Sequence, residues 1–416
     1  MAGQLDSGQE FFQYAAAEKF IAAGARGQGR KHSTMNWTEN WRKTRAALPW
    51  LPAFLWQRVV WRPEEIRPVH LLIGVADHFE PMQREETFGA AVDLREQQRR
   101  VERWCREYPA GIEPWRDQEG QPLRHTYFYP AEDFEDALLD RMAEFCHAGW
   151  GELEIHLHHG VDAPDTAENT ESTLVAFRDA LAARRCLARE GGSGAARYGF
   201  VHGNWALANS DHGRFCGVDR EMRILAETGC YADFTLPAPG TAHSGKINAI
   251  YECLLPLGER APHRSGRRLQ VGRVPETFPM IVQGPLGIDF LRRRRGWPAP
   301  GIEAGELSGA NPPSMRRLGL WRDAAISVQG RSDWIFIKLH CHGMMARDEP
   351  AMFGASIRQF LRELVDGPGN GIEYQVHFVT TREMVNVALA ACAGLRGNPG
   401  EYREYHFRLA EAAVRI

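Results

Sequence analysis

The chain has 416 residues, of which 44% are hydrophobic and 25% are charged, and its formal net charge is −3. A chain of this length and composition can bury a core large enough to fold without disulfide bonds. The small net charge argues against general nucleic-acid binding. No run approaches the roughly 20 apolar residues that a bilayer-spanning helix needs.

The eight cysteines are scattered along the chain and include no Cys-x-x-Cys pair. This spacing argues against a zinc finger and indicates a reducing compartment. Met1–Ala25 lacks the basic start and uninterrupted apolar stretch of a secretory signal. We therefore expect a cytoplasmic protein.

Residues 1–65 are predicted to form an N-terminal extension. As far as about Ser33 they are polar and aperiodic, which predicts a partly disordered lead. The Trp-rich segment Asn36–Trp61 predicts two helices, broken near Pro49 and Pro52, that pack on the outside of the domain. The alternative is a peripheral membrane contact, because basic residues accompany the tryptophans.

From His70 onward, apolar strand patterns alternate with helical spacing. Repeated strand–helix units predict a parallel sheet with right-handed crossovers. A Pro- and Gly-rich region at about 239–331 breaks the rhythm, and we interpret it as a long insertion over the strand C-terminal face. We predict an α/β fold in which residues 66–416 form an irregular (β/α)7-type barrel. The predicted strands are 70–77, 125–130, 151–159, 196–205, 231–237, 333–343 and 373–380, and the predicted helices are 91–108, 134–148, 166–189, 219–229, 352–365 and 382–393.

Several of these strands end in polar side chains, at the C-terminal edge where parallel α/β folds place their catalytic residues. The first strand ends in Asp77 and His78, with Glu80 close behind. A carboxylate and an imidazole at such a position can act as a base and a metal ligand.

The third strand ends in His156, His158 and His159. His156 and His158 share one strand face, and His159 can turn toward the same centre at the strand end. Neutral imidazole is the commonest metal-binding side chain. Three imidazoles this close predict a shared divalent cation.

Over residues 67–395, the insertion excepted, these motifs resemble in order those of the polysaccharide deacetylase (NodB-homology, carbohydrate-esterase) family. That family's first strand ends in Thr-Phe-Asp-Asp-Gly, which corresponds here to residues 75–79. The resemblance implies that Asp77 is the catalytic base and that His78 replaces a metal-binding aspartate.

The second family motif is a His-x-x-x-His pair, and its first member matches His156. Gly160 stands at the second position, so His158 or His159 must serve there. The family's Arg-x-Pro motif is absent in that form, and residues 197–205 occupy its place.

The late Leu-His motif of the family resembles the strand at 335–343, which implies His340 as the general acid. His342 lies on the same strand face and is the alternative acid. The segment 378–383 resembles the family's closing strand-to-helix turn.

The resemblance implies metal-dependent hydrolysis of an N-acetyl group on an amino sugar or a glycan intermediate, with zinc as the expected metal. The metal would activate water, Asp77 would take the water proton and His340 would protonate the leaving amine. His202, Asn204 and Trp205 are expected to contact the sugar, because an indole stacks on a sugar ring and an amide bonds its hydroxyls.

Two other hypotheses remain open. One is a different metal-dependent amidohydrolase or a phosphoesterase, since such enzymes also use clustered histidines. The other is a catalytically silent barrel that binds glycan. A cytoplasmic, membrane-peripheral location would limit the substrate to a nucleotide sugar, a lipid-linked glycan or a small N-acylated compound.

Overall fold

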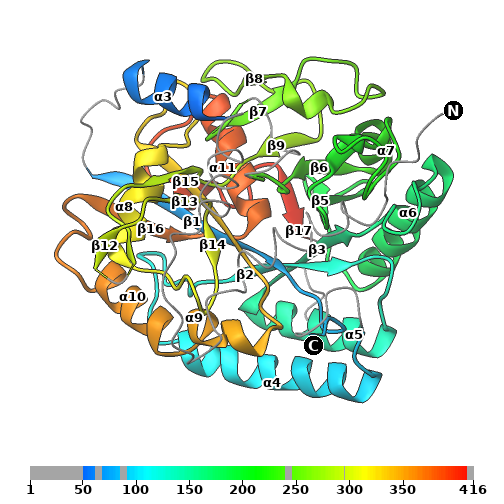
Figure 1. Cartoon of the computed structure of the whole chain (residues 1–416), viewed down its shortest axis with the longest axis horizontal. Coiled ribbons are helices and arrows are strands. Elements are labelled where there is room, and N and C mark those ends of the chain that lie inside the picture. The colour runs from blue at the N-terminus through cyan, green and yellow to red at the C-terminus, as the bar shows by residue number, and fades with distance from the viewer. Residues whose placement is uncertain (1–49, 61–67, 85–90, 239–245, 295, 410–416) are drawn as a thin grey trace, which may run out of the picture.

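The structure is a computed structural model that describes residues 50–60, 68–84, 91–238, 246–294 and 296–409 (Figure 1). The expected disordered lead and the first part of the Trp-rich segment lie outside the described residues. So does the loop at 239–245 that opens the predicted insertion.

A 13-stranded sheet forms the centre of the molecule, and one path through it runs in the order β14-β15-β1-β2-β3-β5-β6-β9-β7-β8. Every neighbouring pair from β14 to β9 is parallel. The prediction of an α/β fold around a parallel sheet is therefore confirmed. The strands of the path are β1 Val69–His78, β2 His125–Pro130, β3 Gly151–Leu157, β5 Ala196–His202, β6 Cys230–Asp233, β7 Ile250–Cys253, β8 Gly266–Arg268, β9 Met280–Val282, β14 Glu306–Leu307 and β15 Trp334–Cys341.

Strand β1 is the third strand of this path and is paired along both of its edges. Along one edge it pairs with β15, and along the other edge it pairs first with β16 and then with β2. Its apolar run suits a strand that is covered on both faces. The strands off the path are β4 Ala188–Glu190, β16 Tyr374–Phe378 and β17 Phe407–Leu409, and two small sheets pair β10 Gly287–Asp289 with β13 Gly301–Glu303 and β11 Arg293–Arg294 with β12 Trp297–Pro298.

Helices cover both faces of the sheet, and alternate residues of β1 enter two cores. Leu71, Ile73 and Val75 join a core with α4, α5, α6, α7 and α10, whereas Leu72 and Ala76 join a core with α11. In Figure 1, α4, α5 and α6 form an outer row along the lower and right edges. The helices are α3 Leu51–Val60, α4 Leu94–Ile112, α5 Asp136–Phe145, α6 Ala167–Ala183, α7 Glu221–Thr228, α8 Met315–Ala324, α9 Glu349–Met352, α10 Ala355–Val365 and α11 Thr381–Cys392, with a π turn at Cys146–Trp150 and 3-10 turns at Leu207–Asn209, Pro262–Arg264, Ala346–Asp348 and Pro399–Tyr402.

The range 239–331, predicted as an insertion, contributes to the central sheet. Strand β9 pairs with β6, and β14 pairs with β15. The small sheets and α8 also fall in this range.

Strands β6 and β15 stand far apart along the sheet path, but one side chain joins them. The buried Lys338 ammonium on β15 donates to the carbonyl oxygens of Phe234 and Leu236 at 2.6 and 2.7 Å. The sheet is therefore curved enough for its two sides to approach each other.

Helix α3 is the described part of the Trp-rich segment. Trp50 and Phe54 are buried against Ile247 and Leu286, as expected for exterior packing. The other side of the helix leaves Trp56 68% exposed. Among the described residues, no helix is long and apolar enough to cross a membrane.

Candidate metal centre

Five side chains converge where β1, β3 and β15 end. They come from the end of β1 and the residues just after it, from β3 and its continuation, and from the residue after β15. Possible ligand atoms of these residues lie within 4.8 Å of one another in two overlapping triads that share Glu80. We call this group the Glu80 cluster; it consists of His78, Glu80, His156, His158 and His342.

Two imidazoles of the cluster point at the same carboxylate oxygen. Oε1 of Glu80 lies 3.0 Å from Nε2 of His156 and 3.2 Å from Nε2 of His158. The other ring nitrogen of each histidine already has an acceptor: Nδ1 of His156 lies 3.1 Å from the Val201 carbonyl oxygen, and Nδ1 of His158 lies 2.7 Å from a Glu132 oxygen. These acceptors hold the proton on Nδ1, so a neutral ring presents a lone pair at Nε2.

Two lone pairs and a carboxylate oxygen repel one another unless a positive charge lies between them. A proton or a metal ion can supply that charge. Histidine ligands typically donate their second N–H to a carboxylate or a backbone carbonyl, which is the arrangement of His156 and His158. The geometry therefore fits a divalent cation.

His78 and His342 complete the cluster. The ring centroid of His78 lies 4.7 Å from that of His156 and 4.8 Å from that of His342. Among the described residues, neither His78 nor His342 has a side-chain hydrogen-bond partner. His340 stands beside them, with its ring centroid 6.4 Å from that of His78.

Burial and mutual proximity set the protonation of these groups. Burial, followed by the nearby His156 and His342, holds the pKa of His78 well below its usual value. Burial alone would raise the pKa of Glu80, but hydrogen bonds with His156 and His158 outweigh it and hold that pKa well below the usual value. A neutral imidazole and an ionised carboxylate are the forms that bind metal.

The pKa of His158 moves in the opposite direction. Burial lowers it, yet the hydrogen bonds with Glu132 and Glu80 raise it to about 10. Without a cation, a proton is therefore held between His158 and the two carboxylates. A metal ion would take the place of that proton.

The structure thus brings together three of the four predicted ligands, His78, His156 and His158. His342, predicted only as an alternative acid, joins them. Glu80 was noticed in the strand-end motif but was assigned no role. Residues i and i+2 of a strand lie on the same face, so the spacing of Glu80 from His78 could have indicated a shared site. This alternation is only weakly determined beyond the end of a strand.

Asp77, the predicted base, is not part of the cluster. Successive strand residues point to opposite faces, so Asp77 turns away from His78. Its carboxylate lies 2.9 Å from Nδ1 of His125 and accepts the Gly343 backbone N–H at 2.7 Å. It is fully buried on the side of the sheet where Trp104 of α4 packs.

His159, the fourth predicted ligand, also lies elsewhere. Its Nε2 is 3.0 Å from a carboxylate oxygen of Glu221 on α7, and its ring centroid is 5.0 Å from that of His202. Possible ligand atoms of these three residues and Cys216 lie within 4.8 Å of one another. We call His159, His202, Cys216 and Glu221 the Cys216 cluster. Its loop and helix members lie too far along the chain from His159 for spacing to reveal them.

The three predicted sugar contacts do not form an open surface. His202 is fully buried in the Cys216 cluster, and Asn204 is 7% exposed. Trp205 is half-buried and packs against the core that includes α4 to α7. The structure therefore places this segment in the protein interior, which does not suit sugar binding.

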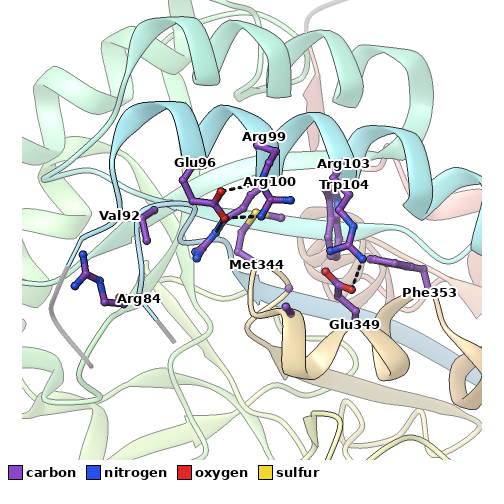
Figure 2. Close-up of a pocket in the computed structure, with 12 residues that line it drawn as sticks. Arg84, Val92, Glu96, Arg99, Arg100, Arg103, Trp104, Met344, Glu349 and Phe353 are labelled. Atoms are coloured by element: carbon purple, nitrogen blue, oxygen red, sulfur yellow. Dashed lines mark hydrogen bonds and ion pairs between the residues drawn. The ribbon is translucent and has the colours of Figure 1, made fainter. Parts of the chain in front are cut away.

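A cavity of about 370 Å³ lies between α4 and the segment that follows β15 (Figure 2). Gly343, the residue after His342, is part of its wall. Figure 2 shows Arg103 of α4 paired with Glu349, and Glu96 paired with Arg99. The guanidinium nitrogen and the carboxylate oxygen are 2.6 Å apart in each pair. Arginine is in excess over glutamate in this cavity, which suits an anionic group. The charged side chains that line it are Arg84, Glu96, Arg99, Arg100, Arg103 and Glu349.

Compared with family models, with curated proteins and with solved structures, the chain gives no significant match.

Proposed function

We propose that this protein is a divalent-metal-dependent hydrolase whose metal ion is held by the Glu80 cluster. One observation carries the proposal: His156 and His158 direct Nε2 at one oxygen of Glu80, while acceptors hold the proton on Nδ1 of each ring. His78 and His342 offer further nitrogen ligands within reach. Nitrogen and oxygen donors in this mixture suit zinc, the expected metal.

A metal bound here would polarise a substrate carbonyl and lower the pKa of bound water toward about 7. The chain supplies the remaining functions. Glu132 and the Val201 carbonyl orient the two imidazoles, and Glu80 provides the negative charge that balances the cation. We propose His340 for proton exchange with substrate, because it lies beside His78 on the sheet face that carries the cluster. Burial and the nearby Lys338 hold the pKa of His340 well below its usual value, so its resting form is the neutral imidazole.

The reaction we propose is hydrolysis of an N-acetyl amide on an amino sugar, a glycan intermediate or a small N-acylated compound. This choice rests on the resemblance of the strand-end motifs to the polysaccharide deacetylase family. Asp77 is not proposed as the base, because His125 and Gly343 engage its carboxylate on the other side of the sheet.

A phosphoesterase is the second candidate. The observation in its favour is the arginine-lined cavity against α4, which would accept a phosphate or another anionic group. None of the five residues of the Glu80 cluster lines this cavity. A catalytically silent glycan-binding barrel is the third, and it predicts that no metal is bound.

The finer fold and the location belong to the same proposal. The bridge from Lys338 to Phe234 and Leu236 supports closure of the curved sheet into an irregular barrel. We propose a cytoplasmic location with peripheral membrane contact through the exposed side of α3, where Trp56 lies.

The test combines metal analysis with a substrate screen. Full-length protein, purified without added metal, is assayed for zinc, and acetylated amino sugars are compared with phosphate esters. Activity on the acetylated sugars should fall at least 100-fold in Glu80→Gln and be unchanged in Glu113→Gln, whose side chain is 64% exposed. The proposal fails if the wild type takes up no divalent ion when zinc is offered, or if Glu80→Gln remains fully active.

A further inference from the structure

The Cys216 cluster is another group of side chains whose possible ligand atoms lie within 4.8 Å of one another, and its members come from four places. His159 follows β3, His202 ends β5, Cys216 lies in the β5–α7 connection and Glu221 begins α7. Glu221 is central: one oxygen lies 3.0 Å from His159 Nε2, and the other lies 3.5 Å from Cys216 Sγ. All four residues are at most 6% exposed.

His159 is held in the orientation of a metal ligand. Nδ1 lies 2.9 Å from a carboxylate oxygen of Asp165, and the Thr170 hydroxyl donates to that same oxygen at 2.7 Å. Asp165 therefore fixes a proton on Nδ1. The Glu80 cluster shows the same arrangement at His156 and His158. Burial lowers the pKa of His159, but Glu221 and Asp165 raise it well above its usual value, so without a cation Nε2 carries a second proton toward Glu221. A metal ion would take the place of that second proton.

Cys216 is a thiol in the absence of a cation, because burial and the nearby Glu221 raise its pKa. Its sulfur accepts the backbone N–H of Asn209 at 3.3 Å and that of Val218 at 3.4 Å. These N–H groups would stabilise the thiolate that forms when a metal ion displaces the thiol proton.

His202 supplies an unpartnered atom. Its Nε2 is buried without a hydrogen bond among the described residues and lies 3.8 Å from Glu221. Nδ1 accepts the Asn204 backbone N–H at 3.2 Å. Binding a metal through Nε2 requires the proton to move to Nδ1, which would replace that contact.

The segment between β5 and α7 has little regular secondary structure to hold it in place. It runs through residues 203–220 with only one short 3-10 turn, yet much of it is buried. Ala208 and Asn209 adopt left-handed backbone conformations, with φ of 49° and 55°. For residues other than glycine this conformation costs free energy and persists only where the surroundings enforce it.

We propose that His159, His202, Cys216 and Glu221 form a closed, four-ligand zinc site that fastens the β5–α7 connection to the ends of β3 and β5. A sulfur, two nitrogens and an oxygen suit tetrahedral zinc, and four protein ligands leave no position for water. The site is thus structural, whereas the Glu80 cluster is the catalytic centre.

Cysteine gives this site a spectroscopic signature that the Glu80 cluster lacks. Full-length protein is loaded with Co²⁺, and the thiolate-to-cobalt charge-transfer absorption is recorded. X-ray absorption of the zinc form should show a sulfur neighbour at about 2.3 Å. Cys216→Ser should lose the absorption band and one equivalent of metal, while Cys253→Ser, another buried cysteine, should keep both.

Glu80→Gln separates the two sites. This variant should lose the metal equivalent of the Glu80 cluster and retain the band. The wild-type X-ray absorption measurement tests for a sulfur ligand even if Cys216→Ser does not fold. The same measurement on Cys341→Ser should keep the sulfur neighbour, which separates the Cys216 cluster from Asp77, His125 and Cys341, whose possible ligand atoms also lie within 4.8 Å of one another. A zinc-loaded wild type without a sulfur neighbour, or a band that survives Cys216→Ser, would overturn the proposal.

Discussion

At the level of single residues, the candidate site depends on which side of a strand each polar group occupies. Asp77 and His78 are neighbours in the chain, but one contacts His125 and the other faces His156 and His342. Asp77 has a partner for each carboxylate oxygen, and its carboxylate lies with His125 and Cys341 in a separate group of possible ligands. Glu80 lies between two imidazoles, and without a cation a proton is held between His158 and the carboxylates of Glu80 and Glu132. The two carboxylates should therefore respond differently to substitution.

We expect Glu80→Gln to lose metal and Asp77→Asn to keep it. The neutral amide that replaces the Glu80 carboxylate cannot balance a cation, so zinc affinity should fall at least 100-fold. In Asp77→Asn the cluster remains intact, but the His125 hydrogen bond changes, so the free energy of unfolding should fall by about 1–3 kcal/mol. Zinc titration and urea unfolding of both variants measure the two effects. Loss of zinc in Asp77→Asn would show that Asp77 contributes to metal binding.

At the level of elements, α11 shows how the sheet face opposite α4 is fixed. Every residue of α11 is buried. Its first turn is capped by Thr380 and Glu383, which satisfy each other's backbone N–H groups. Within that turn, the fully buried Arg382 guanidinium pairs with Glu152 of β3 at 2.7 Å and with Glu404 at 2.7 Å. This ion pair ties the helix to the strand that carries His156.

Arg382→Met should destabilise the fold strongly. It leaves the Glu152 carboxylate buried without its cation, which costs about 3–5 kcal/mol of unfolding free energy. Adding Glu152→Leu should recover most of that loss, because the unpaired charge is then removed as well. Chemical denaturation of the wild type, both single variants and the double variant gives the coupling energy. Equal free energies of unfolding for Arg382→Met and the double variant would show that the ion pair does not hold the helix.

At the level of the whole molecule, the sequence predicts well the strands and helices that alternate along the central parallel sheet. Long apolar runs such as β1 and β15 identify parallel strands, because both of their faces are buried. Strand β9 was missed within the Pro- and Gly-rich range, since three residues are too few to show periodicity. The two clusters could not be separated from sequence either: His158 and His159 are adjacent, and only the turn after β3 sends them to different partners.

The bridge between β6 and β15 gives a prediction for global stability. Asp233, at the end of β6, is fully buried, and this burial raises its pKa from 3.8 to about 7. Burial lowers the pKa of Lys338 to about 7, so its titration affects stability only above that pH. Between pH 3.8 and about 7, the folded chain keeps a proton on Asp233 that the unfolded chain has released. The contribution of Asp233 to the free energy of unfolding is therefore fully present below pH 3.8 and is lost as the pH rises to about 7.

Asp233→Asn removes this dependence, because an amide does not titrate. Its oxygen can still accept the Thr235 backbone N–H that Asp233 accepts at 3.2 Å. Relative to the variant, the wild type should lose unfolding free energy as the pH rises from about 4 to about 7, by at most about 1.4 kcal/mol per pH unit. Urea unfolding of both proteins across that range measures the difference, and other titrating groups cancel in the comparison. A difference that stays constant with pH would mean that Asp233 is ionised in the folded chain, and the curved sheet would then hold a charged pair with Lys338 at its centre.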